Sequence, residues 1–407
     1  MSKYGEEAKR LHREGNRCSA SVYKAFADVN INSDNNIPAP RSEDGKCGTV
    51  LAAEKLIREM GLGDVSDFDN EFLRVYGSLK CAELLKMHGR RCNEFVGFTA
   101  EYVEKLMGKN NNIVPERVIE MRKAWAEGDA KRDAGLEEPE SIEKFRNISY
   151  GPYGDWNLLD VYRPKNKTGE KLPLIVSIHG GGYFYGDKEL YRFYCMHLAE
   201  YGFAVINYNY RLSPENKFPA PLEDALAVFN WISTNSDRYG LDKDNVFMVG
   251  DSAGAQLVSQ FACICSNKAY ADIFGFNLPD DVKLKGVSLA CGMYNIRRRS
   301  DDNNDLMLDY LGTFDLLKDP RTEVHEYITS DYPPAFVFSA ENDFLVTECE
   351  PFAEFLGQKG IKAKAKIYGK KEDVEVGHVF HVNLKLPVGE EANRDQTDFF
   401  KSLIKDY

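Results

Sequence analysis

The sequence lacks a basic surplus and a long apolar run, and its first residues do not predict a leader segment; each of these features argues against a class of protein. Its 407 residues carry 52 Lys and Arg against 64 Asp and Glu, a net charge of -12. A chain with this balance has no basic character to attract nucleic acid or an anionic membrane, so we expect neither as a partner. No stretch approaches the length of a membrane-spanning helix, and the start of the chain is polar and unlike a signal peptide. We therefore expect a cytoplasmic protein.

The sequence also lacks internal repeats and low-complexity segments, and its apolar content of 43% is enough for a sizeable core. It does contain nine cysteines. Because the cytoplasm keeps thiols reduced, we expect these cysteines to be free thiols, metal ligands or redox centres rather than a disulfide framework.

The first part of the chain has the pattern of helices. Apolar residues recur there at helical spacing. The helices predicted in this way cover residues 19–26, 50–60, 71–87, 98–107 and 115–127. Residues 30–44 are rich in Asn, Pro and Asp and residues 108–112 are mostly Gly and Asn, so both are expected to be loops. We expect a helical, cysteine-containing domain over residues 1–110 and a helical linker or cap over residues 111–145.

The pattern changes for residues 146–407, where short apolar runs alternate with helical patterns. The predicted strands cover residues 157–162, 172–178, 203–208, 246–249, 286–290 and 335–339. The predicted helices between them cover residues 191–201, 221–234, 255–266 and 348–359. Strands that alternate with helices indicate a mostly parallel sheet with helices on both faces. The fold class is therefore α/β, preceded by an all-helical N-terminal domain.

The segment Gly250-Asp251-Ser252-Ala253-Gly254 matches the G-x-S-x-G nucleophile elbow. It lies between a predicted strand and a predicted helix, as this motif requires. The sharp turn crowds the backbone, so small residues are needed on both sides of the serine. The turn also places the hydroxyl at a helix N-terminus, where the helix dipole favours negative charge. A plain Gly-Ser turn would not explain this placement, and we predict that Ser252 is a nucleophile.

A glycine-rich segment, His179-Gly180-Gly181-Gly182-Tyr183, follows the predicted strand 172–178. It matches the HGGG-type loop whose backbone amides help to form an oxyanion hole. Consecutive glycines allow the backbone to turn its N–H groups toward a substrate that approaches closely. We predict that the amides of Gly180, Gly181 and Ala253 form this hole. His179 is expected to anchor the loop rather than to carry a proton.

The acid and the base of such a site follow the serine in chain order. Asp343 comes just after the predicted strand 335–339 and is the preferred acid, with Glu341 as its competitor. His378 follows a glycine in a loop near the C-terminus and is the preferred base, whereas His381 is expected to pack behind it. His325 precedes the acid and breaks the order. The predicted catalytic roles require each other, because the imidazole accepts the serine proton and the carboxylate orients the imidazole.

These motifs together resemble the hormone-sensitive-lipase-like branch of the α/β-hydrolases over about residues 147–407. The segments that carry the resemblance are HGGGY at 179–183, YNYRLSPE at 208–215, GDSAG at 250–254, Asp343 and GHVFH at 377–381. The resemblance implies an α/β-hydrolase fold and a carboxylesterase that acts on small-molecule esters of small to medium acyl groups, without a cofactor or a metal. It also implies that the YNYRLSPE segment and Asp224 are architectural. The alternative among hydrolases is a peptidase of the prolyl-oligopeptidase kind, and the HGGG loop favours the esterase.

The N-terminal part contains Cys18, Cys47, Cys81 and Cys92. Their order resembles a small family, assigned to redox chemistry, that is named for its C…GCAxxG…C…C pattern, and the match covers about residues 10–107. The central motif departs from the family, because the sequence after Cys47 lacks the second glycine. The resemblance implies a redox or metal-binding role, in which case a thiol module with an accessory hydrolase is an alternative function. The other reading is that the four thiols are small buried apolar groups. Cys291 and the remaining cysteines are expected to pack in the core.

Overall fold

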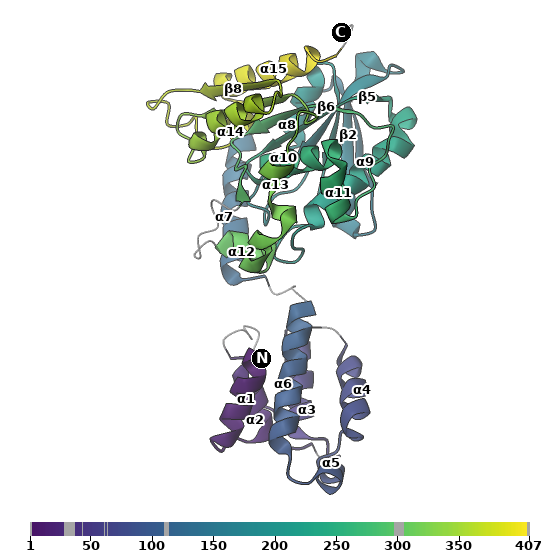
Figure 1. Cartoon of the computed structure of the whole chain (residues 1–407), viewed down its shortest axis with the longest axis vertical. Coiled ribbons are helices and arrows are strands. Elements are labelled where there is room, and N and C mark those ends of the chain that lie inside the picture. Colours follow the sequence, from purple (N-terminus) through teal and green to yellow (C-terminus); the bar gives the residue numbers. More distant parts are fainter. Residues whose placement is uncertain are drawn as a thin grey trace. The chain divides into compact units, whose positions relative to one another are not determined.

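The computed structural model describes residues 2–27, 37–42, 44–60, 62, 64–109, 114–296 and 305–404. The chain divides into two compact units, Met1–Pro115 and Glu116–Tyr407 (Figure 1). The expected loop 30–44 falls partly, and the expected break at 108–112 mostly, outside the described residues.

The first unit is built from six helices within its described residues: α1 (Lys3–Arg13), α2 (Cys18–Ala25), α3 (Gly48–Glu59), α4 (Val65–Tyr76), α5 (Cys81–His88) and α6 (Cys92–Lys109). Its core contains fully buried aromatic side chains, among them Phe26, Phe68 and Phe72. Aromatic rings bury a large apolar area each, so this small unit has a core of its own.

The helix predicted over residues 71–87 is wrong as one element, because α4 ends at Tyr76 and α5 begins at Cys81. Gly77 separates them in the left-handed conformation, with φ 79°, and its N–H donates to the carbonyl of Leu73. This is the usual glycine C-cap, which side chains other than glycine adopt at a cost. The sequence pattern also missed α1, in which Ser2 caps the helix by accepting from the amide of Gly5.

The second unit contains one eight-stranded sheet in the order β1-β2-β4-β3-β5-β6-β7-β8. Its strands are β1 (Ile142–Ser149), β2 (Leu158–Pro164), β3 (Leu172–Ile178), β4 (Ala204–Tyr208), β5 (Leu241–Asp251), β6 (Leu284–Ala290), β7 (Ala335–Ala340) and β8 (Ala363–Tyr368). β2 is antiparallel to both β1 and β4, and the other neighbours are parallel. All six predicted strands are present, and the α/β fold predicted from the alternation is confirmed.

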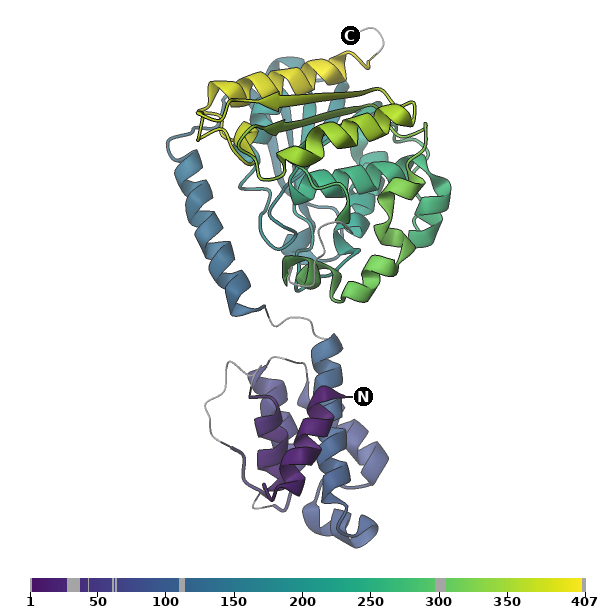
Figure 2. The ribbon, with the colours of Figure 1, turned by 60° about the vertical axis from the view of Figure 1, so that its left-hand side comes forward.

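Helices cover both faces of this sheet because successive side chains of a buried strand point to opposite faces. Leu174 lies in the core cluster packed under α9 (Ala220–Tyr239), α10 (Ala253–Ser266) and α14 (Val346–Gln358). The next residue, Ile175, lies in the cluster packed under α8 (Arg192–Glu200) and α15 (Pro387–Lys401). In Figure 2 the yellow α15 lies on one side of the sheet and the lime-green α14 on the other.

Shorter helices complete the described part of this unit: α11 (Lys268–Phe274), α12 (Asp305–Leu311) and α13 (Val324–Tyr327). The helix predicted over residues 115–127 is longer in the structure, where α7 runs from Glu116 to Asp133, and the segment expected to be a linker or cap over residues 111–145 also contains the start of β1 at Ile142. β1 and β8 are edge strands whose pattern the sequence analysis did not recognise. Both carry lysines, as edge strands do to avoid pairing with other chains.

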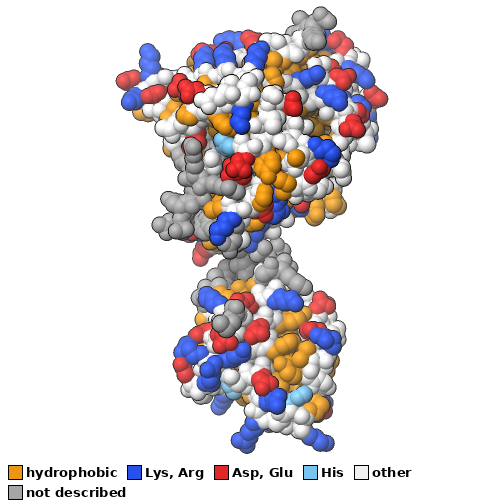
Figure 3. Space-filling model, viewed as in Figure 1, with side chains coloured by type: hydrophobic (Ala, Val, Ile, Leu, Met, Phe, Trp, Pro, Cys, Tyr) orange, Lys and Arg blue, Asp and Glu red, His pale blue; other side chains and the backbone are white. Residues whose placement is uncertain are grey.

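The face of the molecule shown in Figure 3 mixes acidic and basic side chains rather than gathering the basic ones. None of the helices in the described part of the chain is long and apolar enough to cross a membrane.

Candidate active site

Ser252 lies at the turn between the end of β5 and the start of α10, and it caps that helix with φ 51° and ψ -119°. The two glycines of the motif are required by space. A Cβ at Gly250 would lie 2.5 Å from the carbonyl oxygen of Gly254, and a Cβ at Gly254 would lie 2.3 Å from the carbonyl oxygen of Ile178. The strained conformation therefore depends on glycine on both sides of the turn.

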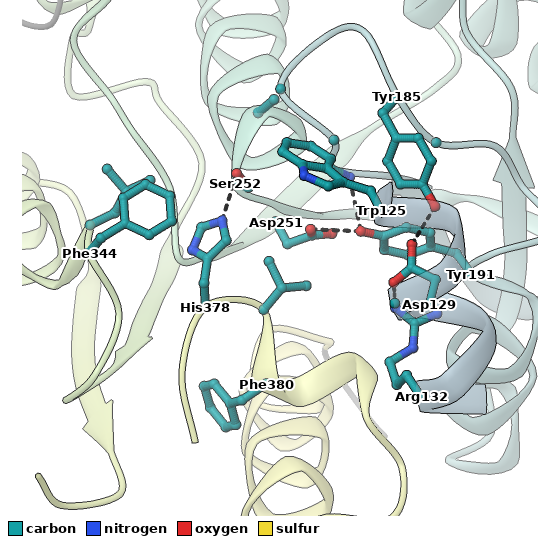
Figure 4. Close-up of a pocket in the computed structure, with 18 of the residues that line it drawn as sticks. Trp125, Asp129, Arg132, Tyr185, Tyr191, Asp251, Ser252, Phe344, His378 and Phe380 are labelled. Atoms are coloured by element: carbon teal, nitrogen blue, oxygen red, sulfur yellow. Dashed lines mark hydrogen bonds and ion pairs between the residues drawn. The ribbon is translucent and has the colours of Figure 1, made fainter. Parts of the chain in front are cut away.

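Two further side chains form a chain of hydrogen bonds with Ser252. The Nε2 atom of His378 lies 2.9 Å from the Ser252 Oγ, and its Nδ1 atom lies 2.7 Å from Oδ1 of Asp343. Figure 4 shows the imidazole directed at the serine. The three residues come from the ends of β5 and β7 and from the loop after β8, so the sheet brings together groups that lie 126 and 35 residues apart in sequence.

The environment of Asp343 favours its ionised form. Burial by itself would raise the pKa of the carboxyl, but hydrogen bonds from His378, the Ser339 hydroxyl and the Leu345 amide hold the pKa below its usual range. An ionised carboxylate accepts from Nδ1–H and leaves Nε2 of the imidazole as an acceptor that faces the serine. Glu341, the competing acid, has none of these contacts among the described residues.

The HGGG loop follows β3, but the structure corrects the assignment of one amide. The N–H of Gly180 donates to the hydroxyl of Tyr191 at 3.2 Å, so this donor is already used. No described group accepts from the amides of Gly181 and Gly182, and both glycines line the same cavity as Ser252 and Ala253. The difference between Gly180 and the two later glycines follows from the turn at Gly181. There φ is 112°, and a Cβ would lie 2.0 Å from the carbonyl oxygen of Tyr185.

The two other histidines near the site are buried. Burial lowers the pKa of His179 to about 4, and its ring stacks on Tyr210 with centroids 4.2 Å apart. Burial also lowers the pKa of His381 to about 3, and its ring packs edge-on against Phe338. Both imidazoles are therefore neutral near pH 7. Neither contacts Ser252, which agrees with the expectation that they support the fold.

The cavity in front of Ser252 has a volume of about 580 Å³ and is walled partly by α7. Trp125 of this helix packs against Phe184 and Tyr185, with ring centroids 4.8 and 5.5 Å apart. Asp129 accepts a hydrogen bond of 2.6 Å from the Tyr185 hydroxyl. In Figure 4 these residues lie across the pocket from Phe344, whose ring is 4.3 Å from that of His378. The sequence analysis placed a linker or cap here but identified none of these side chains.

Asp251 lies beside Ser252 and is buried. Burial raises the pKa of its carboxyl to about 6, although Tyr191 donates a hydrogen bond of 2.8 Å to it. A group whose folded-state pKa is raised stabilises the fold below its unfolded pKa and loses that contribution as the pH rises through 6. We therefore expect Asp251→Asn to raise the free energy of unfolding above pH 7 by up to about 3 kcal/mol, and by almost nothing near pH 4.

Urea unfolding from pH 4 to pH 8, followed by near-ultraviolet circular dichroism, would measure this difference. Asp237→Asn is a suitable control because Asp237 is exposed and its pKa is lowered by its pairing with Lys171. A difference between Asp251→Asn and the wild type that does not change with pH would contradict the prediction.

The four N-terminal cysteines all lie at helix starts. Cys18, Cys81 and Cys92 are the first residues of α2, α5 and α6, and Cys47 caps α3. Burial, followed by the neighbouring thiols of Cys92 and Cys47, raises the pKa of Cys18 to about 12. Burial and then Cys47 and Cys92 raise the pKa of Cys81 as well. The fold therefore brings the four thiols near one another. In the described part of this unit, no three ligand atoms of Cys, His, Asp or Glu lie within 4.8 Å of one another.

Comparisons with known proteins agree with this fold. Residues 175–382 match a family described as the alpha/beta hydrolase fold. The chain is 32% identical over 211 residues to a probable carboxylic ester hydrolase of Mycobacterium tuberculosis, covering 49% of this chain and 48% of that protein. It is 28% identical over 271 residues to an acetyl esterase of Salmonella typhi, covering 62% and 78%. Among solved structures, esterase B of Lactobacillus rhamnosis superposes with a TM-score of 0.65 at 27% identity, covering 71% of this chain and 96% of that one.

The chain thus spans about half of the Mycobacterium relative, and 31% of a versiconal hemiacetal acetate esterase of Dothistroma septosporum that is 38% identical over 103 residues. The family match begins within β3 and includes β4 to β8, the HGGG loop, the G-x-S-x-G segment and the loop of His378, and it covers more than half of the sequence. From its fold and from this match, the chain belongs to the α/β-hydrolase fold family.

Proposed function

We propose that the protein is a carboxylesterase of the hormone-sensitive-lipase-like branch that hydrolyses small-molecule esters through an acyl-enzyme on Ser252. The observation that carries this proposal is the chain of hydrogen bonds from Asp343 through His378 to Ser252, which opens into a cavity of about 580 Å³. The esterase names of the relatives support it. A serine hydroxyl is a weak nucleophile until a neighbouring imidazole accepts its proton, and this arrangement supplies that imidazole.

The proposed reaction uses each group once per half-reaction. The Ser252 Oγ attacks the ester carbonyl carbon as Nε2 of His378 takes its proton, and Asp343 steadies the imidazolium that forms. The amides of Gly181, Gly182 and Ala253 donate to the carbonyl oxygen as it becomes negative. His378 then protonates the departing alcohol. A water molecule, deprotonated by the same imidazole, then attacks the acyl carbon, and the imidazolium returns the proton to the Ser252 Oγ as its bond to the acyl carbon breaks and the acid departs.

The cavity supports acyl groups of small to medium size. Its volume is in the range that suits a small organic ligand, and aromatic side chains close it on two sides. A panel of p-nitrophenyl esters of rising chain length tests this size range, with p-nitroanilides beside them. Hydrolysis of the esters alone is expected. Preferential cleavage of the anilides would favour the peptidase alternative, and no turnover of either class would overturn the proposal.

Trp125 is expected to limit the length of the acyl group. Its indole lies 3.7 Å from where a Cβ on Gly182 would stand, at the wall of the cavity next to the proposed oxyanion hole. We expect Trp125→Ala to raise the ratio of kcat/KM for the octanoate ester over the butyrate ester by about tenfold, because two additional buried methylenes contribute about 1.6 kcal/mol. Trp125→Phe should leave the ratio within about threefold of the wild type. An unchanged ratio in Trp125→Ala would place the acyl group elsewhere.

We further propose that the N-terminal unit is a thiol redox module, in which Cys18 pairs with Cys92 and Cys47 pairs with Cys81. Two observations support these pairs. Burial and then the nearby thiol of Cys92 raise the pKa of Cys18, and burial and then the nearby thiol of Cys47 raise that of Cys81. The backbone supports the second pair, since the Cys47 amide donates to Leu79 and the Cys81 amide donates to Gly45. Pairs of thiols favour disulfide exchange over a metal site, which needs three or four ligands around one point.

Each dithiol would react with the disulfide of a small thiol such as glutathione, becoming a protein disulfide while two molecules of the small thiol are released. The full chain is equilibrated with oxidised glutathione, its remaining free thiols are alkylated, and its disulfides are mapped by mass spectrometry. Iron and zinc are measured separately on anaerobically purified protein. The two stated disulfides are expected, and Cys92→Ser should lose only the first of them. If all four thiols are still alkylated after oxidation, the redox proposal is wrong and the cysteines are core-packing residues. Stoichiometric iron or zinc would favour the metal-binding alternative.

A further inference from the structure

Cys291 follows the last residue of β6, at the end of the sheet where Ser252 and Asp343 also lie. It is fully buried and has φ 50°, a left-handed conformation that non-glycine residues adopt only when the surroundings impose it. Val379, the residue after His378, is also left-handed, with φ 60°. For a β-branched residue this conformation is rarer still. Two unusual backbone positions therefore occur next to the catalytic groups.

A hydrogen bond joins these two positions. The amide of Val379 donates to the Cys291 Sγ at 3.4 Å, and this contact holds the loop that carries His378 against the end of β6. The backbone of β6 also holds the nucleophile, since the Ser252 amide donates to the Ala290 carbonyl at 2.9 Å. The Cys291 amide in turn donates to the Phe338 carbonyl in β7 at 2.8 Å. Residues 290–291 thus connect the serine, the acid-bearing strand and the histidine loop.

The thiol also faces the catalytic acid. The ligand atoms of Cys291, Asp343 and His378 all lie within 4.8 Å of one another. Ser339, whose hydroxyl lies 4.0 Å from the Cys291 Sγ, donates to Oδ2 of Asp343 at 2.6 Å. Burial, followed by the negative charge of Asp343, raises the pKa of the Cys291 thiol well above its ordinary value. The thiol therefore keeps its proton and can donate it as a weak hydrogen bond.

We infer that Cys291 is a positioning residue of the catalytic triad, whose S–H donates to the Asp343 carboxylate while its sulfur accepts from the Val379 amide. The inference rests on the proposed esterase function. A donor suits this position, because it adds a hydrogen bond to a buried carboxylate. The polarizable sulfur at the same time accepts from the partly buried amide of Val379.

Three variants test the inference on the full chain: Cys291→Ala, Cys291→Ser and Cys349→Ala. Cys349 is a matched control because it is also buried and its thiol also contacts the backbone, but it lies on α14 and its partners are the carbonyls of Val337 and Lys366 rather than the Val379 amide. Cys291→Ala is expected to lower kcat about tenfold with KM within about twofold of the wild type, since only the triad geometry is affected. Cys291→Ser restores a donor and an acceptor and should recover kcat to within about threefold of the wild type. Cys349→Ala should lower the thermal stability but leave kcat and KM unchanged.

The pH profile separates positioning from packing. Without the thiol, the charge of Asp343 is less compensated and favours the protonated imidazole more strongly, so the acid limb of kcat/KM should move to higher pH in Cys291→Ala. It should not move in Cys349→Ala. A wild-type kcat and acid limb in Cys291→Ala would overturn the inference, as would a Cys291→Ser variant that is no better than Cys291→Ala.

A measurement without substrate keeps this result distinct from a failure of the proposed function. The proton between Nδ1 of His378 and Asp343 is expected to give a far-downfield resonance in the proton NMR spectrum, assigned by its loss in His378→Ala. This resonance should shift or broaden in Cys291→Ala and remain in Cys349→Ala. If the protein cleaves no ester but the resonance responds in this way, the positioning role stands and the proposed substrate is wrong. An unchanged resonance in Cys291→Ala would contradict the inference whatever the substrate is.

Discussion

Ser252→Ala is expected to abolish labelling by a fluorophosphonate probe and to lower kcat for a p-nitrophenyl ester by about four orders of magnitude or more. The physical reason is that the Oγ removed is the atom that bonds to Nε2 of His378 and, in the proposed reaction, carries the acyl group. The alanine keeps a Cβ in place, so the turn with φ 51° is not altered. Labelling is measured by gel fluorescence and located by mass spectrometry of the Ser252 peptide.

Ser259→Ala provides a matched control for this change. Ser259 lies on the same helix, α10, and is buried, but its hydroxyl contacts Tyr332 rather than the cavity. This variant should be labelled at the wild-type rate. A different residue would be the nucleophile if Ser252→Ala were labelled as strongly as the wild type, or if the adduct of the wild-type protein were found on another peptide.

His378→Ala is expected to lower kcat by about three orders of magnitude or more with little change in substrate binding. The loss follows from the position of the ring, which contacts both Ser252 at 2.9 Å and Asp343 at 2.7 Å. Free imidazole added to the variant should restore part of the rate, since it can occupy the space and accept the serine proton. Steady-state kinetics with a p-nitrophenyl ester, with and without imidazole, measures both effects.

His381→Phe is the control for the histidine assignment. His381 is buried against Phe338 and Tyr194, so a phenyl ring suits its surroundings. Its Nδ1 atom has no hydrogen-bond partner among the described residues, so little polar interaction is lost. We expect kcat to fall by less than about tenfold. If His381→Phe were the inactive variant and His378→Ala the active one, the proposed base would be wrong.

Local sequence patterns were enough to predict most of the buried strands of the second unit. Buried parallel strands are continuous apolar runs, so residues 172–178 and 335–339 could be assigned from composition alone. The elbow at Gly250 to Gly254 requires small residues for steric reasons, so it can be recognised from the amino-acid types alone. The edge strands β1 and β8 carry lysines and resemble helix or loop. Their strand conformation depends on pairing with a neighbour, which local sequence does not encode.

The same contrast holds within the candidate site. Ser252, Asp343 and His378 could be predicted because the mechanism demands these residue types in this order, and the fold brings them within hydrogen-bonding distance. The choice among the three glycines of the HGGG loop could not be predicted. Each glycine has the same local signal, and the hydroxyl that engages Gly180 comes from Tyr191 in a later turn.

The sequence by itself determined the α/β fold, the order of the motifs and the residue types that a serine hydrolase needs, because each follows from local sterics and periodicity. Only the tertiary structure decided which side chains line the cavity and which lie beside Asp343 and His378. Trp125 on α7 and Cys291 after β6 carry no motif, and the fold places the first at the cavity wall and the second beside Asp343 and His378. Such contacts arise from packing between distant elements, and the periodicity of a single segment contains no information about its partner.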